Sequence, residues 1–302
     1  MFTTLVVQPI FNLLVLIYAV IPGHNFGVAI ILFTILVRLL MWPLVKKQLH
    51  HAKAMRKLQP ELKKIKQAAG GDRQKESKLV MELYKEREIN PFASLGLVLV
   101  QLPIFLGLYL GIKRLVDNPQ QIIDFSYSFI HDLSWMQTLA QDIHRFDESL
   151  FGLVNLGQKA VGDNGIYWPA MLIVIVGAAT QYYQSKQLMP QSKDARSLRS
   201  ILKEAGQGKS ADQQEVGVAM GRWMLYLIPG FVFIFGLNFP AALPLYWLTN
   251  SLVAVIQQGR VLKEDETEAL ALADKATVTV TEDKPAKRSK SKAHRKHKKR
   301  KR

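Results

Sequence analysis

The sequence contains no cysteine among its 302 residues. This absence excludes structural disulfides, thiolate metal sites and lipid attachment to a cysteine. The seven histidines are scattered, and the adjacent pair His50 and His51 would point in different directions on a helix, which disfavours joint metal binding. No Ser/His/Asp set, HExxH motif or Walker loop occurs in a fitting context. The sequence therefore predicts no catalytic centre, no metal site and no cofactor.

Acidic residues are missing from five long apolar runs. The chain is 49% hydrophobic, yet its mean hydropathy is only +0.05, because the charges are concentrated between these runs. Such segregation is typical of a polytopic membrane protein with water-exposed loops. The runs that can span a bilayer are 27–45, 92–112, 166–184, 221–238 and 241–257. We predict an all-α membrane protein with five transmembrane helices, the last two forming a tight hairpin at Pro240.

The charged segments between the runs predict an orientation. Lys and Arg outnumber Asp and Glu by 13 to 6 in 46–91, by 7 to 4 in 185–222 and by 15 to 7 in 259–302. Segment 113–165 has 4 basic against 7 acidic residues. Because basic loops stay in the cytoplasm, we expect the N-terminus outside and the C-terminus inside the plasma membrane. The net charge of +16 favours acidic partners such as anionic lipid, RNA or acidic polypeptide.

The N-terminal apolar run, Leu5–Ile21, leaves two alternatives open. It has no basic flank and no A-x-A cleavage site, so it is not expected to be a signal peptide. It could form a short sixth span, but two polar residues and a proline interrupt it. We favour a helix that lies in the membrane interface within residues 1–26, with Phe11 and Tyr18 as its anchors.

Segment 46–91 is predicted to form a soluble helical hairpin on the cytoplasmic side. Its first helix carries an apolar seam with steps of three and four residues, formed by Met55, Leu58, Leu62, Ile65 and Ala69. Gly70 and Gly71 should end this helix, and Asp72 can cap the next one. The second helix carries the answering stripe of Leu79, Val80, Leu83 and Tyr84. Pro60 should kink the first helix.

The C-terminal segment 259–302 is predicted to be a disordered basic tail. Its last part, Ala286–Arg302, has no apolar residue larger than alanine and so cannot bury a core. We interpret it as a flexible arm that contacts RNA or anionic lipid without sequence specificity, with a mere topology signal as the alternative. The expected contact residues are Lys287, Arg288, Lys290, Lys292, Arg295, Lys296, Lys298, Lys299, Arg300, Lys301 and Arg302.

Arg38 lies near the middle of the run 27–45. A charge at the centre of a membrane helix costs about 2.5–3.5 kcal/mol or more. Arginine cannot avoid this cost by losing its proton, and no Asp or Glu lies in any of the five runs to pair with it. An unpaired charge has to be hydrated, so Arg38 predicts a water-filled recess that reaches membrane depth. Thr34, one helical turn away, would lie on the same face.

The chain resembles the YidC-type membrane-protein insertases of the Oxa/Alb superfamily in four stretches. These are NFGVAIILFTILVRLLMWPLVKKQ around Arg38, MRKLQPELKKIKQ with LYKEREINP, NPFASLGLVLVQLPIFLGLY, and FPAALPLYWLTNSLVAVIQQ. Together with less specific matches, they cover most of residues 25–258. Segment 113–165 departs from the family, because it is longer than the expected outer segment, and we expect extra helices there on the outer surface.

The resemblance implies a five-helix insertase core, residues 27–258, around a hydrophilic groove open to the cytoplasm and to lipid. It implies that Arg38 lines this groove, and it makes Gln101, Gln181, Tyr246, Trp247 and Asn250 candidate groove or core polar positions. Thr34 joins the candidate groove residues because it lies on the same helix face as Arg38. The implied function is non-enzymatic movement of nascent hydrophobic segments and their short polar flanks into the bilayer of a bacterial inner membrane. The implied partners are nascent membrane proteins, the ribosome, the Sec translocon and the signal recognition machinery.

Two alternatives come from other functional classes. A secondary transporter would also place a charge at mid-membrane, but it should show repeated halves and broken helices, which the sequence does not indicate. A membrane-anchored ribosome or RNA tether would account for the basic tail but leaves Arg38 unexplained.

Overall fold

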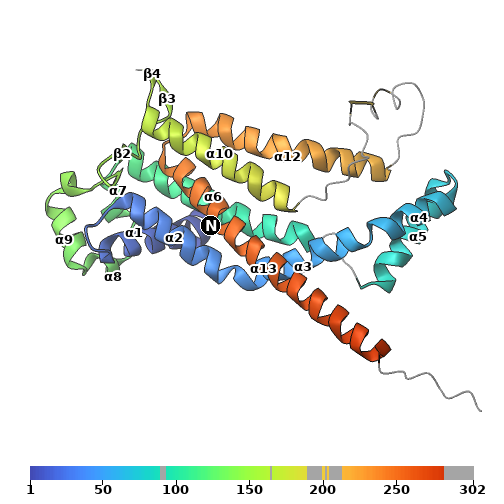
Figure 1. Ribbon diagram of the computed structural model, residues 1–302. Coiled ribbons are helices and arrows are strands. Elements are labelled where there is room, and N and C mark those ends of the chain that lie inside the picture. Colours follow the sequence, from blue (N-terminus) through green and yellow to red (C-terminus); the bar gives the residue numbers. More distant parts are fainter. Residues whose placement is uncertain (89–92, 164, 189–198, 201–202, 204–212, 282–302) are drawn as a thin grey trace, which may run out of the picture. The chain divides into compact units, whose positions relative to one another are not determined.

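The computed structural model of the protein describes residues 1–88, 93–163, 165–188, 199–200, 203 and 213–281. The described part is mostly helical, with two short β-hairpins (Figure 1). The chain divides into two compact units, Met1–Gly259 and Arg260–Arg302. The first unit contains all five predicted apolar runs.

The N-terminal run forms a continuous helix made of η1 (Thr3–Val7) and α1 (Gln8–Val20). By length and composition, Thr3–Val20 is long and apolar enough to cross a membrane. Phe11 and Tyr18, predicted to anchor this helix in the lipid interface, are 1% and 0% exposed inside the protein core. The prediction of their anchoring role is therefore wrong, because α1 turns its aromatic side chains toward the protein.

The run 27–45 is divided between α2 (Phe26–Leu40) and α3 (Trp42–Lys57), which meet at an angle of 61°. Asn25 caps α2, since its Oδ1 accepts a hydrogen bond from the backbone N–H of Val28 at 3.1 Å. The break follows from Pro43, which has no N–H to continue the hydrogen-bond ladder. The run predicted to form one span is thus a bent pair of helices.

The other predicted runs lie in α6 (Ala93–Asp117), α10 (Trp168–Leu188), α12 (Gln213–Asn238) and α13 (Ala242–Thr281). The helix pair α10 and α12 packs side by side. Helix α13 continues through Thr281, so the disorder predicted from residue 259 onward is wrong for 259–281. A helix can continue there because the segment lacks proline and glycine between residues 260 and 281.

Membrane-crossing potential can be judged from length and composition. Among the described residues, Thr3–Val20 and Leu99–Asp117 are long and apolar enough by themselves, and the bent pair α2–α3 qualifies if it is one span. Trp223–Asn238 is a shorter apolar helix. The protein therefore has the apolar helices of a membrane protein, and the number of five spans stays a prediction.

After α6, which includes the first five residues of segment 113–165, residues 118–167 form a small folded layer. It contains the short helices α7 (Gln121–Asp124), α8 (Ser128–His131), α9 (Ser134–Gln141) and η2 (Ile143–Arg145). Two antiparallel hairpins follow, β1 (Ser149–Leu150) with β2 (Val154–Asn155), and β3 (Val161–Gly162) with β4 (Gly165–Ile166). Extra helices were expected here, whereas the hairpins depart from the all-α prediction. They are too short for an alternating pattern to reveal them.

A buried asparagine ties this layer to α1. Asn12 is 3% exposed; its amide nitrogen donates to the Phe125 carbonyl at 3.3 Å, and its amide oxygen accepts from the Tyr127 N–H. The sequence suggested that Asn12 interrupts an apolar helix. In the structure it satisfies backbone groups of the layer, as a buried polar side chain must.

The hairpin expected in 46–91 is formed by α4 (Gln59–Ala69) and α5 (Arg73–Glu86). Gly70 and Gly71 make the turn with φ of +60° and +94°, and the Asp72 side chain accepts from the N–H groups of Gln74 and Lys75. Its small core consists of Leu58, Leu62 and Leu83, with Ile65, Val80 and Tyr84 packed against it. Burial raises the pKa of the Tyr84 hydroxyl above its ordinary value.

One expectation about this hairpin is wrong. Pro60 does not kink a continuous helix, because α3 ends at Lys57 and Pro60 lies in the first turn of α4. The first turn tolerates proline, since its N–H groups have no partner within the helix.

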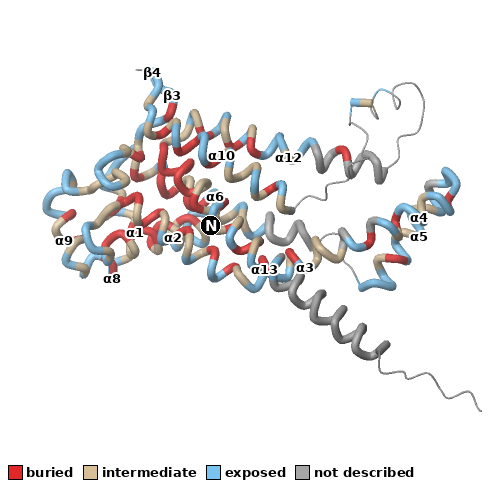
Figure 2. Tube along the Cα trace, viewed as in Figure 1, coloured by how far each residue is buried: buried red, intermediate tan, exposed pale blue. Residues whose placement is uncertain are grey.

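The main core joins α1, α2, α6, the layer 118–167, α10 and α13. Figure 2 shows the buried residues gathered around α1, α2 and the start of α10, while α4 and α5 are mostly exposed or half-buried. The large fully buried side chains include Phe26 and Phe33 of α2 and Tyr246 of α13. This core fixes the segment of α2 that leads to Arg38.

The closest backbone approach in this core predicts a stability effect. A Cβ added at Gly27 would lie 2.9 Å from the Leu150 backbone Cα, whereas a Cβ at Gly230 of α12 would meet nothing within 4 Å. Overpacking typically costs about 1–3 kcal/mol. Gly27→Ala should therefore lower the thermal unfolding midpoint in detergent by several degrees, and Gly230→Ala should not. Equal midpoints for the two variants would contradict this packing.

Candidate functional site

Arg38 lies inside the protein near the end of α2. Its side chain is 6% exposed, and its Nε donates a hydrogen bond to Oδ1 of Asn250 in α13 at 2.7 Å. A guanidinium carries five N–H donors, and this amide oxygen is the one acceptor that the described residues supply. Asn250 is neutral, so it orients the guanidinium without cancelling its charge.

A second polar contact, one turn earlier in α13, joins this helix to α6. Tyr246 lies one turn before Asn250 on the same face of α13 and is 2% exposed. Its hydroxyl accepts a hydrogen bond from Nε2 of Gln101 in α6 at 2.5 Å. Four of the predicted site residues, Arg38, Asn250, Tyr246 and Gln101, thus form one polar seam that joins three helices.

The structure adds Gln257 to this seam. Its Nε2 donates to the backbone carbonyl of Arg38 at 3.1 Å, and the side chain is 6% exposed. Arg38 lies in the last turn of α2, where helix carbonyls lack partners within their own helix. Gln257 therefore supplies a donor at the point where α2 breaks. Gln257 is not among the site residues predicted from the sequence, although its spacing of seven from Asn250 places it on the same face.

The remaining candidates have other roles. Thr34 is 1% exposed, and its hydroxyl donates to the Ile30 carbonyl of its own helix at 2.6 Å, so its hydrogen bond is local. The Trp247 ring stacks on Phe105 of α6 with centroids 5.5 Å apart, which makes it a packing contact between α6 and α13. Gln181 is half-buried in α10, and within the described residues no hydrogen bond joins it to the Arg38 seam.

The basic residues predicted to contact RNA or lipid, Lys287 through Arg302, lie outside the described residues. The side chain of Met55, predicted for the hairpin seam, is also outside them. Among the described residues, no group of three His, Asp or Glu could hold a metal ion.

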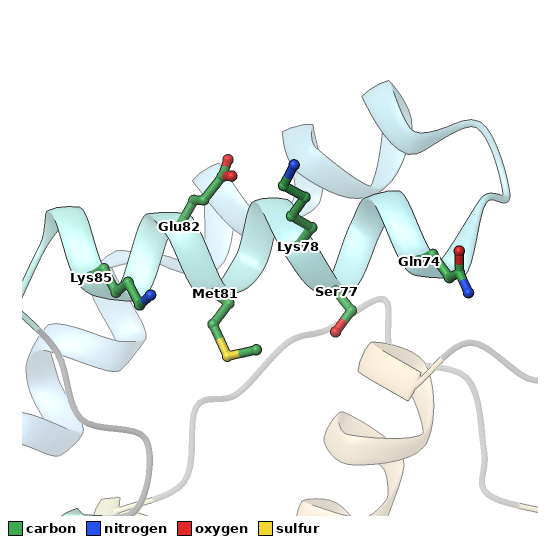
Figure 3. Close-up of a pocket in the computed structure, with 6 residues that line it drawn as sticks. All are labelled: Gln74, Ser77, Lys78, Met81, Glu82 and Lys85. Atoms are coloured by element: carbon green, nitrogen blue, oxygen red, sulfur yellow. The ribbon is translucent and has the colours of Figure 1, made fainter.

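Helix α5 borders a hollow of about 540 Å³ lined by Gln74, Ser77, Lys78, Met81, Glu82 and Lys85. Figure 3 shows Ser77 and Met81 directed to one side of the helix and Lys78 and Glu82 to the other. Met81 is 60% exposed. The hollow thus combines an exposed, adaptable thioether with charges of both signs.

Comparison with known proteins gives these features a family context. A family described as 60Kd inner membrane protein matches residues 16–268. The chain is 32% identical over 241 residues to the membrane protein insertase YidC of Oleidesulfovibrio alaskensis, and 31% identical over 240 residues to that of Fusobacterium nucleatum. It is 32% identical over 256 residues to the membrane protein insertase MisCA of Bacillus subtilis.

The coverage differs between these relatives. The alignment with the Oleidesulfovibrio protein includes 80% of this chain and 35% of that relative. The corresponding shares are 80% and 87% for the Fusobacterium protein, and 83% and 76% for MisCA. The chain thus spans about a third of the Oleidesulfovibrio protein and most of the other two. The resemblance inferred from the four sequence stretches is confirmed, and the apolar helices agree with a bacterial inner-membrane protein. The match over residues 16–268, together with these relatives, shows that the chain belongs to the family of the 60Kd inner membrane protein, which includes the YidC-type insertases.

Proposed function

We propose that this protein is a membrane-protein insertase that moves nascent hydrophobic segments and their short polar flanks into the bilayer. The observation that carries the proposal is Arg38, a buried cation whose acceptor among the described residues is a neutral amide. The guanidinium can attract an acidic client flank, because its partner Asn250 is uncharged and leaves its positive charge in place. The insertases among the relatives support the same function.

In the proposed mechanism, the polar flank of a client enters a hydrophilic groove at Arg38, lined by the half-buried seam residues Gln101 and Asn250. Tyr246 is buried and supports the groove through its hydrogen bond with Gln101. Arg38 holds the flank transiently, and the shorter polar path lowers the barrier for moving it across. The client's apolar segment then passes into lipid, gaining about 25 cal/mol for each Å² of apolar surface removed from water. No covalent step and no cofactor are needed.

We place five spans in the membrane, with the N-terminus outside and the C-terminus in the cytoplasm. The alternating excess of basic residues supports this orientation. The helical hairpin α4–α5 would then receive clients on the cytoplasmic side, and the hollow beside α5 offers it an exposed contact. The basic tail would hold the ribosome or anionic lipid nearby, and the Sec translocon and signal recognition machinery are the further partners that the family suggests.

The first prediction tests the charge of Arg38. Arg38→Lys should keep much of the insertion of clients with acidic flanks, because lysine retains the charge. Arg38→Ala should lose more, with the largest loss for the most acidic flank. The measurement is insertion of a client series with neutral and acidic flanks into vesicles, at equal abundance of each variant. An equal loss across the series would exclude an electrostatic role.

A second prediction follows from the 2.7 Å contact between Arg38 and Asn250. Asn250→Asp keeps the shape of the side chain but puts a carboxylate on the guanidinium, which cancels the charge while leaving Arg38 in place. Insertion of acidic-flank clients should fall nearly as far as in Arg38→Ala, with the unfolding midpoint unchanged or raised. Ser251→Ala is the matched control, because the Ser251 hydroxyl donates to the Leu248 carbonyl of its own helix and makes no other hydrogen bond within the described part of the chain. Undiminished insertion by Asn250→Asp would contradict the mechanism.

A third prediction separates the insertase from an RNA tether. Removing residues 286–302 should weaken ribosome or anionic-lipid binding and flatten its salt dependence, since counterion release scales with the number of neutralised phosphates. Insertion should be reduced but retained. A complete loss of function would favour the tether, and an unchanged salt slope would show that the tail is not the electrostatic contact.

A further inference from the structure

The turn of the β1–β2 hairpin presents two large apolar side chains to the surroundings. Phe151 is 67% exposed and Leu153 is 79% exposed, with Gly152 between them. The backbone of Phe151 has φ of +55°, a left-handed conformation that is rare for an aromatic residue. Single exposed apolar residues are ordinary, but a strained turn that holds a phenylalanine and a leucine outward together indicates a partner for them.

The base of this hairpin is fixed to the first turn of α2. The Asp147 carboxylate accepts hydrogen bonds from the Asn25 amide at 2.9 Å and from the Ser149 N–H at 2.9 Å. The Asp147 carbonyl accepts from the Phe26 N–H at 3.3 Å, and Leu150 packs directly on Gly27. The hairpin therefore lies at the level where α2 begins.

The other strand is fixed to two more helix ends. The Leu156 carbonyl accepts from the Ala242 N–H at 3.0 Å, at the first residue of α13. The Asn155 N–H donates to the hydroxyl of Tyr167, directly before α10, at 2.8 Å. Trp168, the first residue of α10, is 68% exposed. Three apolar helices thus begin beside the hairpin, and an exposed tryptophan lies at the same level, as is typical of membrane–water interfaces.

We propose that Phe151 and Leu153 insert into the interface of the lipid bilayer and anchor the layer 118–167 to the membrane surface. The partner is the membrane itself, because α2, α10 and α13 begin beside the hairpin and the ends of membrane helices lie at the level of the lipid headgroups. Aromatic and aliphatic side chains are favoured at that level. The anchor would also steady the start of α2, three turns before Arg38. This inference rests on the first turns of α2, α10 and α13 lying at the membrane surface, and not on the insertase mechanism.

The absence of native cysteine makes a direct test possible. Phe151→Cys and Leu153→Cys each introduce one thiol, which is labelled with an environment-sensitive fluorophore after reconstitution into vesicles of phosphatidylcholine and phosphatidylglycerol. Gln137→Cys, at an exposed polar position of α9 in the same layer, is the matched control. Quenching is measured with aqueous iodide and with lipids that carry a spin label near the headgroup.

Labels at residues 151 and 153 should emit at shorter wavelength, be quenched by the spin-labelled lipid, and resist iodide several-fold better than the label at residue 137. Iodide quenching equal to that of the control would overturn the proposal. Protection of all three labels would also overturn it, because the whole layer rather than the hairpin turn would then be embedded. The two separate thiol positions keep the test decisive if one variant fails to fold, and the readout is independent of insertion activity.

Discussion

The burial of one positive charge governs the organisation of this protein. Arg38 cannot release its proton, and a charge in an apolar surrounding costs about 2.5–3.5 kcal/mol or more unless it finds acceptors. In the structure, the Nε of Arg38 donates a hydrogen bond to the amide oxygen of Asn250 at 2.7 Å, and this neutral partner lies 212 positions away in the sequence. Because an amide orients the guanidinium without neutralising it, Arg38 keeps its positive charge inside the folded protein.

In the same region the helix is interrupted between α2 and α3, and a polar side chain of α13 stabilises the interruption. Helix α2 ends at Leu40, and α3 leaves it at 61°, so the last carbonyls of α2 lose their helical partners. Gln257 donates to the carbonyl of Arg38, on the same helix as Asn250. One helix, α13, therefore holds both the side chain and the backbone of Arg38, and it is itself held to α6 through Tyr246 and Gln101.

The layer 118–167 supports this arrangement from the other end of α2. Asn12 joins the layer to α1 through hydrogen bonds to backbone groups, and the side chains of Asn25 and Asp147 join it to α2 through a hydrogen bond to each other. Gly27 permits close approach of Leu150. Asn12, a buried polar residue that a hydropathy profile would count against a membrane helix, is here a link between segments. These contacts fix the start of α2, and with it the side of the helix on which the Arg38 side chain lies.

The sequence by itself determined the helical class, the apolar runs and the turn at Gly70 and Gly71, because these depend on local composition and on the backbone freedom of single residues. It also identified Arg38 and Asn250 as site candidates, one from the cost of its charge and the other from the family resemblance. The tertiary structure decided what no local pattern contains. It placed Phe11 and Tyr18 in the core rather than at the lipid surface, and it paired Arg38 with residues more than two hundred positions away. The physical reason is that a polar or aromatic side chain is satisfied by whichever group packing brings within reach, and packing joins distant segments.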